Sequence, residues 1–448
     1  MIKRAFLSMI AMLTLVVMVG GIIFVVTRNH QRATLDVAAV EGANPQIVQP
    51  RTGLFPLFKI AKAIGWKANE APTPAAGLKV QAFATKLDHP RWMLALPNGD
   101  MLVAETNAPP KPDDNDGFSG WVEKQLQQDA GADIKSPNRI TLLRDTNGDG
   151  IADQRFVLVS GLNSPFGMAL VGDNLYVADT DALLRFPFKV GDTKITAKPD
   201  KIVDLPAGRI NHHWTKNVIA TPDGSKLYVA IGSNSNVGDR GMRVEDGRAA
   251  IWEIDTKTRS HRIYAYGLRN PVGLGWEPST HQLWVVVNER DGLGSDLVPD
   301  YLTSVQFGGF YGWPWYYWGH YPDSRPKDPP PELINETSIR PDYALGPHTA
   351  ALGLTFASGQ ALGANYADGA FIGEHGSWNR DPLSGYKVVF VKFRKGQPVG
   401  KPIDVLTGFL TPKSEAHGRP VGVVIGKDGA LLVADDVGNT IWRVSGAK

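Results

Sequence analysis

Two adjacent histidines, His212 and His213, lie in the segment GRINHHWTKN at residues 208–217, directly before a run that predicts a β-strand. Histidine titrates near neutral pH, so either side chain could take a proton from a hydroxyl group or ligate a metal ion. A solvent-exposed turn is the ordinary setting of neighbouring polar residues in a loop. The pair is therefore compatible with acid–base chemistry, a metal site or a plain turn. Other parts of the chain must decide among these three interpretations.

An acidic loop, DTNGDGIAD at residues 145–153, has the composition of a calcium-binding loop. Ca²⁺ takes about six to eight oxygen ligands, and alternate positions of such a loop can direct oxygens at one centre. An EF-hand would need a glutamate where Phe156 stands, so we expect a loop between strands, with a solvated acidic turn as the alternative. The expected ligands of a structural calcium ion are Asp145, Asn147, Asp149, the carbonyl of Ile151, and Asp153.

A third candidate is the pair Arg269 and Asn270, in YGLRNPVGLGWEP at residues 266–278. A guanidinium group presents a rigid fork of donors to a carboxylate or quinone oxygen, and an amide adds an adjustable donor. Taken alone the pair is weak evidence, because an arginine in a turn is usually solvated.

A repeated pattern supplies the elements that would position these residues. Six segments after about residue 78 share an apolar run, a turn with glycine or aspartate, and an apolar strand, as in NVIATPDGSKLYVAIG and GVVIGKDGALLVADD. The PDG and KDG turns predict hairpins, and a spacing of roughly 50–60 residues is typical of propeller blades. We therefore expect an all-β, six-bladed β-propeller, whose last strand at 439–444 lies beside an early strand at 77–85. No G-x-G-x-x-G follows a strand, which argues against a Rossmann nicotinamide domain.

The composition narrows the class of protein. The chain has 448 residues, a net charge of +2 and no basic block, which gives no case for nucleic acid. It has no cysteine, which excludes disulfides, thiolate metal sites and covalently attached c-type haem.

The amino-terminal segment predicts a membrane anchor. Residues 5–26 are uncharged and apolar, long enough to span a bilayer, and no A-x-A cleavage signal follows them. We expect an uncleaved signal anchor over residues 1–28, with a cleaved signal peptide as the alternative. A connector at 29–77 and the propeller at 78–448 follow, the latter exported to the periplasm.

The order of the motifs resembles the sorbosone dehydrogenase and soluble glucose (aldose sugar) dehydrogenase family over about residues 78–445. The resemblance rests on NHHWTKNVIATPDGSKLYVAIG, GLRNPVG, NERDG, GGFYGWP and HGRPVGVVIGKDG, in that order. Members of that family are six-bladed propellers that use pyrroloquinoline quinone (PQQ) and Ca²⁺. The resemblance implies oxidation of a sugar or sugar aldehyde by hydride transfer to the quinone.

The resemblance also assigns roles to individual residues. His213 takes the place of the catalytic base, and His212 stands where the glucose enzymes have an aspartate, so it is expected to contact substrate. Backbone groups of Arg290 and Asp291 are expected at a cofactor calcium. The expected cofactor contacts are Arg269, Asn270 and Arg419, with His417 in the place of a second arginine. A lysine of the family has no clear match, and His375, Arg380 and Lys387 are the candidates for its position.

Two other functions remain open from the sequence. A calcium-dependent propeller lactonase would use the histidine pair to activate water, and a membrane-tethered binding propeller would have no catalysis. In a dehydrogenase, electrons would pass to a separate acceptor such as a membrane quinone or a cytochrome. The loops at 105–136 and 320–350 are expected to set the substrate.

Overall fold

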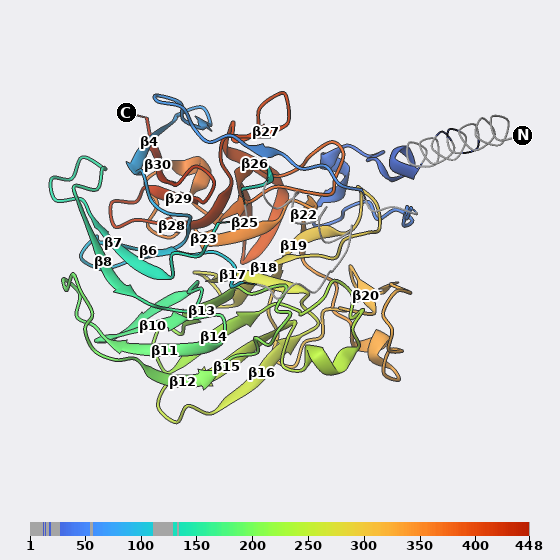
Figure 1. The fold of residues 1–448 in the computed structure, drawn as a ribbon, viewed down its shortest axis with the longest axis horizontal. Helices are drawn as coiled ribbons and strands as arrows, with labels where there is room; N and C mark the ends of the chain where they lie inside the picture. The colour runs from blue at the N-terminus through green and yellow to red at the C-terminus, as the bar shows by residue number, and fades with distance from the viewer. Residues whose placement is uncertain are drawn as a thin grey trace, which may run out of the picture.

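The computed structural model describes residues 12, 14, 18, 27–53, 57–110, 129–131 and 134–447. Within these residues, six antiparallel sheets of four or five strands form the blades of a β-propeller (Figure 1). The innermost strands of successive blades lie side by side around the axis. The predicted six-bladed propeller is therefore confirmed.

Each blade is a meander of hairpins that runs from the axis outward. The blades, in chain order and from the inner to the outer strand, are β5 (Pro90–Ala95), β6 (Met101–Glu105), β7 (Arg139–Arg144) and β8 (Gln154–Ser160); β9 (Met168–Val171), β10 (Asn174–Ala178), β11 (Ala182–Pro187) and β12 (Asp200–Asp204); β13 (Lys216–Ala220), β14 (Lys226–Ile231), β15 (Ala250–Asp255) and β16 (His261–Tyr266); β17 (Asn270–Trp276), β18 (Leu283–Asn288), β19 (Pro299–Ser304) and β22 (Tyr343–Pro347); β23 (Ala351–Phe356), β24 (Gly369–Glu374), β25 (Lys387–Arg394) and β26 (Gln397–Thr407); and β28 (Pro420–Ile425), β29 (Leu431–Asp435), β30 (Thr440–Gly446) and β4 (Leu78–Ala84).

The ring closes between strands from the two ends of the propeller sequence. Strand β4 pairs antiparallel with β30, with Val80 opposite Val444, so the first strand completes the sixth blade. This is the closure that the sequence predicts.

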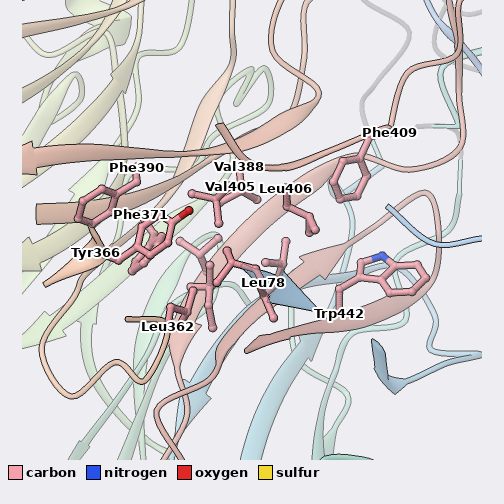
Figure 2. Close-up of a cluster of buried hydrophobic side chains, with 14 of the residues drawn as sticks. Leu78, Leu362, Tyr366, Phe371, Val388, Phe390, Val405, Leu406, Phe409 and Trp442 are labelled. Atoms are coloured by element: carbon pink, nitrogen blue, oxygen red, sulfur yellow. The ribbon is translucent and has the colours of Figure 1, made fainter. Parts of the chain in front are cut away.

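Apolar side chains fill the space between blades. Figure 2 shows such a cluster, in which Phe371 and Phe390 of the fifth blade lie near Leu78 and Trp442 of the sixth. Strand residues alternate between faces, so every second side chain enters a layer of this kind. Fully burying one large apolar side chain contributes about 1.5–3 kcal/mol, which makes these layers the main source of stability.

The described residues between 29 and 77 lie along the propeller. Strand β1 (Glu41–Gly42) pairs with β22, β2 (Lys62–Ala63) pairs with β27 (Glu415–Ala416), and β3 (Thr73–Pro74) pairs with β26. Residues 53–66, GLFPLFKIAKAIGW, are largely apolar, and their described part contains no helix. The predicted anchor over 1–28 lies almost entirely outside the described residues, among which no helix is long and apolar enough to cross a membrane.

Candidate active site

The candidate residues lie on one end of the propeller. In an antiparallel meander, the loop that enters the inner strand and the loop between the second and third strands emerge at the same end. His213 and Arg269 directly precede inner strands β13 and β17, and Asp291 lies between β18 and β19. Loops from several blades therefore meet at this end.

A cavity of about 520 Å³ lies among these loops of the third, fourth and fifth blades. Its wall includes His212, His213, Arg269, Asn270 and Asp291. A volume of this size is ordinary for a small-molecule site. Five residues that the sequence singles out are thus brought together in one wall.

His213 is held by one ring nitrogen. Its Nδ1 lies 2.8 Å from the carbonyl oxygen of Ser233, and because a carbonyl only accepts, Nδ1 carries the hydrogen. Nε2 is then the nitrogen that can receive a proton. Burial, followed by the charge of Arg269, lowers the pKa of His213 well below its usual value, so the ring is neutral at pH 7. The adjacent His212 is exposed and also lines the cavity.

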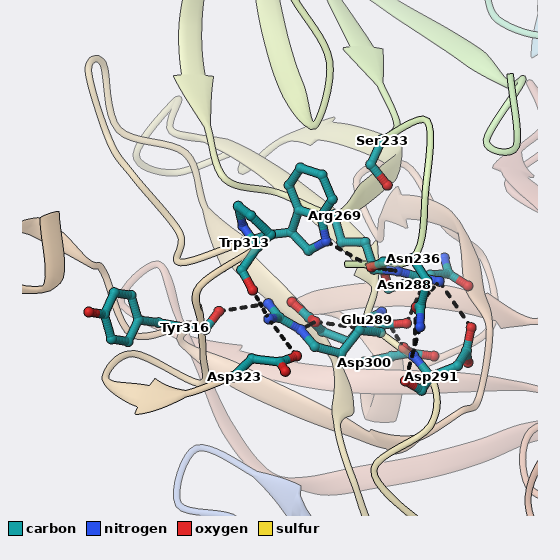
Figure 3. Close-up of polar contacts among 12 residues, drawn as sticks. Ser233, Asn236, Arg269, Asn288, Glu289, Asp291, Asp300, Trp313, Tyr316 and Asp323 are labelled. Atoms are coloured by element: carbon teal, nitrogen blue, oxygen red, sulfur yellow. Dashed lines mark hydrogen bonds and ion pairs between the residues drawn. The ribbon is translucent and has the colours of Figure 1, made fainter. Parts of the chain in front are cut away.

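Arg269 ties together the segments that follow β14 and β18 (Figure 3). Its Nε donates to the carbonyl of Asn236 at 3.2 Å, and Nη1 donates to the carbonyls of Glu289 at 2.6 Å and Asn288 at 3.4 Å. Its Nη2 donates to Oδ1 of Asn236 and to Oδ2 of Asp291, at 2.9 and 3.0 Å. All five N–H groups thus have protein acceptors, so Arg269 shapes the wall and brings a positive charge to it.

Asp291 is the anionic centre of the wall. Its Oδ1 accepts from Nδ2 of Asn379 at 2.8 Å and lies 3.5 Å from Nδ1 of His348, whose Nε2 is 3.1 Å from the carbonyl of Gly294. Burial alone would raise the pKa of Asp291, but the charge of Arg269 and the contact with His348 outweigh it and hold the pKa below its usual range. Asp291 also raises the pKa of His348 against the effect of burial.

The backbone calcium ligands expected at Arg290 and Asp291 stay a prediction. The carbonyl of Asp291 accepts hydrogen bonds from Asn236 at 3.1 Å and Arg325 at 2.6 Å. The Arg290 side chain is fully buried, and its Nη1 donates to the carbonyl of Pro314 at 2.6 Å. Asp291 itself lines the cavity.

Two of the expected cofactor contacts lie beneath the amino-terminal segment. Nη2 of Arg419 donates to the carbonyl of Ala61 at 3.3 Å. The ring of His417 stacks on Trp66 with centroids 4.9 Å apart, and its Nδ1 is 3.0 Å from the carbonyl of Gly65. Neither side chain is among the cavity-lining residues in the described part of the chain.

The three remaining basic candidates also lie outside the cavity wall. Nε2 of His375 is 2.9 Å from the buried carboxylate of Asp436, and Lys387 donates to Asp404 at 2.7 Å. Arg380 is buried and donates to main-chain carbonyl groups. Each of these side chains has a partner within the protein.

The acidic loop at 145–153 uses its side chains to stabilise its own turn. Asp145 accepts from the amides of Gly148 and Gly150 at 2.7 and 2.8 Å, and Asp153 accepts from the amide of Thr146 at 2.7 Å. The parts of the chain that the structure describes contain no group of three or more His, Cys, Asp or Glu able to hold a metal ion. The structure thus does not confirm the calcium ligands predicted at Asp145, Asn147, Asp149, Ile151 and Asp153.

Several residues of the wall carry no signal in the sequence analysis. They are Asn236, His348, Trp378 and Asn379 from the blades, and Phe58 from the amino-terminal segment. His348 lies on a loop that enters an inner strand, as the histidine pair does. Asn379 lies on a loop between a second and a third strand, as Asp291 does. The blade repeat therefore marks both positions. Phe58 lies outside the repeat, and nothing in the pattern could place it.

Solved structures similar to this chain share its β-propeller fold. A Trichoderma reesei structure of carbohydrate-active enzyme family AA12 matches with a TM-score of 0.67 at 18% identity, over 87% of this chain and 99% of that one. The holo form of the PQQ domain of Coprinopsis cinerea pyranose dehydrogenase matches with a TM-score of 0.64 at 19% identity, over 86% and 100%. At these identities the likeness concerns the fold.

The chain belongs to the TrAA12-like family, whose model matches residues 135–299 and 330–447. An uncharacterized protein of Borreliella burgdorferi is 29% identical over 69% of this chain and 86% of its own length. The PQQ-dependent pyranose dehydrogenase of Coprinopsis cinerea is 25% identical over 52% of this chain. The match spans only 40% of that enzyme. The family resemblance stated from the motifs is confirmed.

Proposed function

We propose that the protein is a PQQ-dependent dehydrogenase of sugars or sugar aldehydes, of the aldose or sorbosone type, with His213 as its general base. One observation carries the proposal: the carbonyl of Ser233 fixes the hydrogen on Nδ1 of His213, and burial keeps the ring neutral, in the wall of the cavity. A neutral imidazole in a fixed tautomer can accept a proton from a substrate hydroxyl.

Relatives of the chain support the choice of cofactor. The Coprinopsis relative is described as PQQ-dependent, and one of the Trichoderma AA12 structures is described as a calcium structure. We therefore propose PQQ together with calcium. The cavity carries hard oxygen donors, among them the carboxylates of Asp291 and Asp300, which suit a cation of this kind.

The residues of the cavity fit a quinone. Oδ1 of Asn270 is buried and has no hydrogen-bond partner among the described residues, so the amide group has capacity for a ligand. A Cβ atom at Gly232 would collide with Asn270 and His213, so glycine at this position lets the two side chains approach each other. Asn270 and the positive charge of Arg269 would hold the quinone end of the cofactor.

The chain's own groups account for binding and proton transfer. Bound PQQ would supply an ortho-quinone that accepts two electrons from the substrate. His213 takes the hydroxyl proton on Nε2, and the Ser233 carbonyl stabilises the imidazolium that forms through its bond to Nδ1. His212 would contact the substrate at the exposed side of the cavity, and the Asp291–Arg269 pair keeps this wall rigid.

We also propose that residues 1–28 anchor the protein in the cell membrane with the propeller in the periplasm. The uncharged stretch at 5–26 supports this. An anchored enzyme would pass electrons to a membrane quinone or a cytochrome nearby. Deletion of 1–28 should move the activity from the membrane pellet to the supernatant, and full-length protein released by high salt would contradict the anchor.

The decisive experiment reconstitutes the purified protein with PQQ and Ca²⁺ and follows dye reduction with aldoses, sorbosone and lactones. We expect dye reduction with aldoses or sorbosone that depends on PQQ. Calcium-dependent lactone hydrolysis without any response to PQQ would instead identify the hydrolase. Binding of sugar without turnover would identify the binding propeller.

A further inference from the structure

Two aromatic side chains in the cavity wall remain exposed. Phe58, from the amino-terminal segment, is 37% exposed, and Trp378, from the loop between β24 and β25, is 41% exposed. Their ring centroids are 5.7 Å apart with an angle of 31° between the planes. They therefore form one continuous aromatic surface that faces the cavity.

Main-chain and ionic contacts hold this aromatic pair in place. The amide of Lys59 donates to the carbonyl of Trp378 at 2.9 Å. The ammonium group of Lys59 pairs with the carboxylate of Asp381, which also binds Nε of Arg32 at 3.1 Å. Exposing two apolar rings to water is unfavourable, and these contacts fix them in the exposed position. Such an arrangement is typical of a surface that a ligand covers.

The residue beside the pair offers a polar contact. Asn379 is 7% exposed, and its Oδ1 has no hydrogen-bond partner within the described ranges. Its Nδ2 is already bound to Asp291, so the amide orientation leaves Oδ1 as an acceptor. The wall thus combines an apolar surface with a hydrogen-bond acceptor, and a pyranose ring needs both, because its C–H groups form an apolar face bordered by hydroxyl groups.

We propose that Phe58 and Trp378 form the wall on which a pyranose ring stacks, with Asn379 accepting a hydrogen bond from one of its hydroxyl groups. The two aromatic side chains are then specificity-determining residues, and the segment before the propeller completes the substrate site. This inference rests on the proposed sugar dehydrogenase function. It names the substrate as cyclic and excludes a short open-chain aldehyde as the preferred one.

The test compares Phe58→Leu and Trp378→Leu, which keep an apolar side chain but remove the aromatic face, with Trp378→Phe, which keeps it. Phe307→Leu is the control, because Phe307 is 60% exposed and packs on Arg262 away from the cavity. Binding of D-glucose, D-galactose and D-mannose is measured by calorimetry on the full chain, with and without PQQ. PQQ binding is followed separately by its absorbance, and dye reduction gives KM and kcat.

We expect each leucine variant to raise the sugar dissociation constant and KM about tenfold. Trp378→Phe and the control should stay within about threefold of the wild type, with PQQ affinity unchanged. Wild-type sugar affinity in both leucine variants would overturn the inference while leaving the dehydrogenase intact. Loss of PQQ affinity in the same variants would also overturn it, because the pair would then serve the cofactor.

Sugar binding also separates the inference from the proposed function. If the wild type binds sugar but does not bind PQQ and does not reduce the dye, the proposed function fails. Sugar binding to the leucine variants still tests the stacking wall in that case. A wild type that binds none of the three sugars would overturn the inference. If Trp378→Leu melts at a lower temperature, the comparison of Phe58→Leu with Trp378→Phe decides whether the aromatic wall binds the sugar.

Discussion

Nδ1 of His213 and the carbonyl oxygen of Ser233 are 2.8 Å apart, and this one contact leaves Nε2 as the ring nitrogen that can accept a proton. Ser233 stands at the beginning of the loop that follows β14, while His213 precedes β13, so the contact joins the two ends of one hairpin. The tautomer is therefore fixed by the third blade itself.

Replacement of His213 by glutamine should lower kcat by about 10²–10⁴-fold, since that is the usual effect of losing a positioned base. PQQ affinity should not change, because the amide retains a similar shape. The matched control is His212→Gln, for which we expect a smaller effect, mainly on KM. Near-normal turnover in His213→Gln, or a greater loss in His212→Gln, would show that the base is misassigned.

The pH dependence of kcat/KM should reflect the lowered pKa of His213. The base acts in its neutral form, and burial together with Arg269 keeps it neutral below the usual histidine pKa of about 6.5. Activity should therefore persist as the pH falls through 6.5 and decline only at more acidic values. Steady-state dye reduction from pH 4 to 8 measures this. An acid limb centred near pH 6.5 would contradict it.

Arg269→Ala should destabilise the protein and weaken PQQ binding together. The substitution removes Arg269 from the Asp291 carboxylate, and breaking a fully buried ion pair typically costs about 3–5 kcal/mol, so we expect a smaller loss for this partly exposed pair. Urea unfolding and a PQQ titration give the two values. Arg269→Lys should recover part of the stability. An unchanged urea midpoint in Arg269→Ala would show that Arg269 does not stabilise the loops of the cavity wall.

Asp179, in the loop between β10 and β11, should make stability depend on pH. Burial raises its pKa to about 7, against 3.8 for the ordinary carboxyl, so the folded state holds a proton that the unfolded state releases. Stability should fall as the pH rises from about 4 to about 7. Asp179→Asn should then raise the melting temperature at pH 8 and lose this advantage near pH 4. The exposed Asp173→Asn is the control, and a difference that does not vary with pH would disprove the assignment.

The sequence predicted the parts of the site that belong to the blade repeat. His213, Arg269 and Asn270 immediately precede or begin inner strands, and the repeat alone places such positions at one end of a ring. Arg419 precedes an inner strand in the same way, yet residues 61–66 lie over it. A repeat pattern contains no information on where a segment outside the repeat docks.

The direction of a side chain within a loop is the second feature that could not be predicted from the sequence. Arg290 and Asp291 are neighbours, but one side chain is buried among the carbonyl groups of residues 314 and 316 while the other faces the cavity. The backbone of His348 has a φ of +58°, in the left-handed region that few residues other than glycine adopt, and no composition rule indicates this. In the acidic loop, Asp145 and Asp153 accept from amides of the same loop, a detail that the composition of the loop does not reveal.

The pairing of β4 with β30 has a consequence for how the protein is made. Residues 78–84 leave the ribosome long before residues 440–446, and their partner strand does not exist during that interval. A nascent chain therefore carries an open ring with one unpaired apolar strand for most of its synthesis. Such strands are prone to aggregate, so production of the protein should depend on chaperones that hold the early strand until the last blade has been translated.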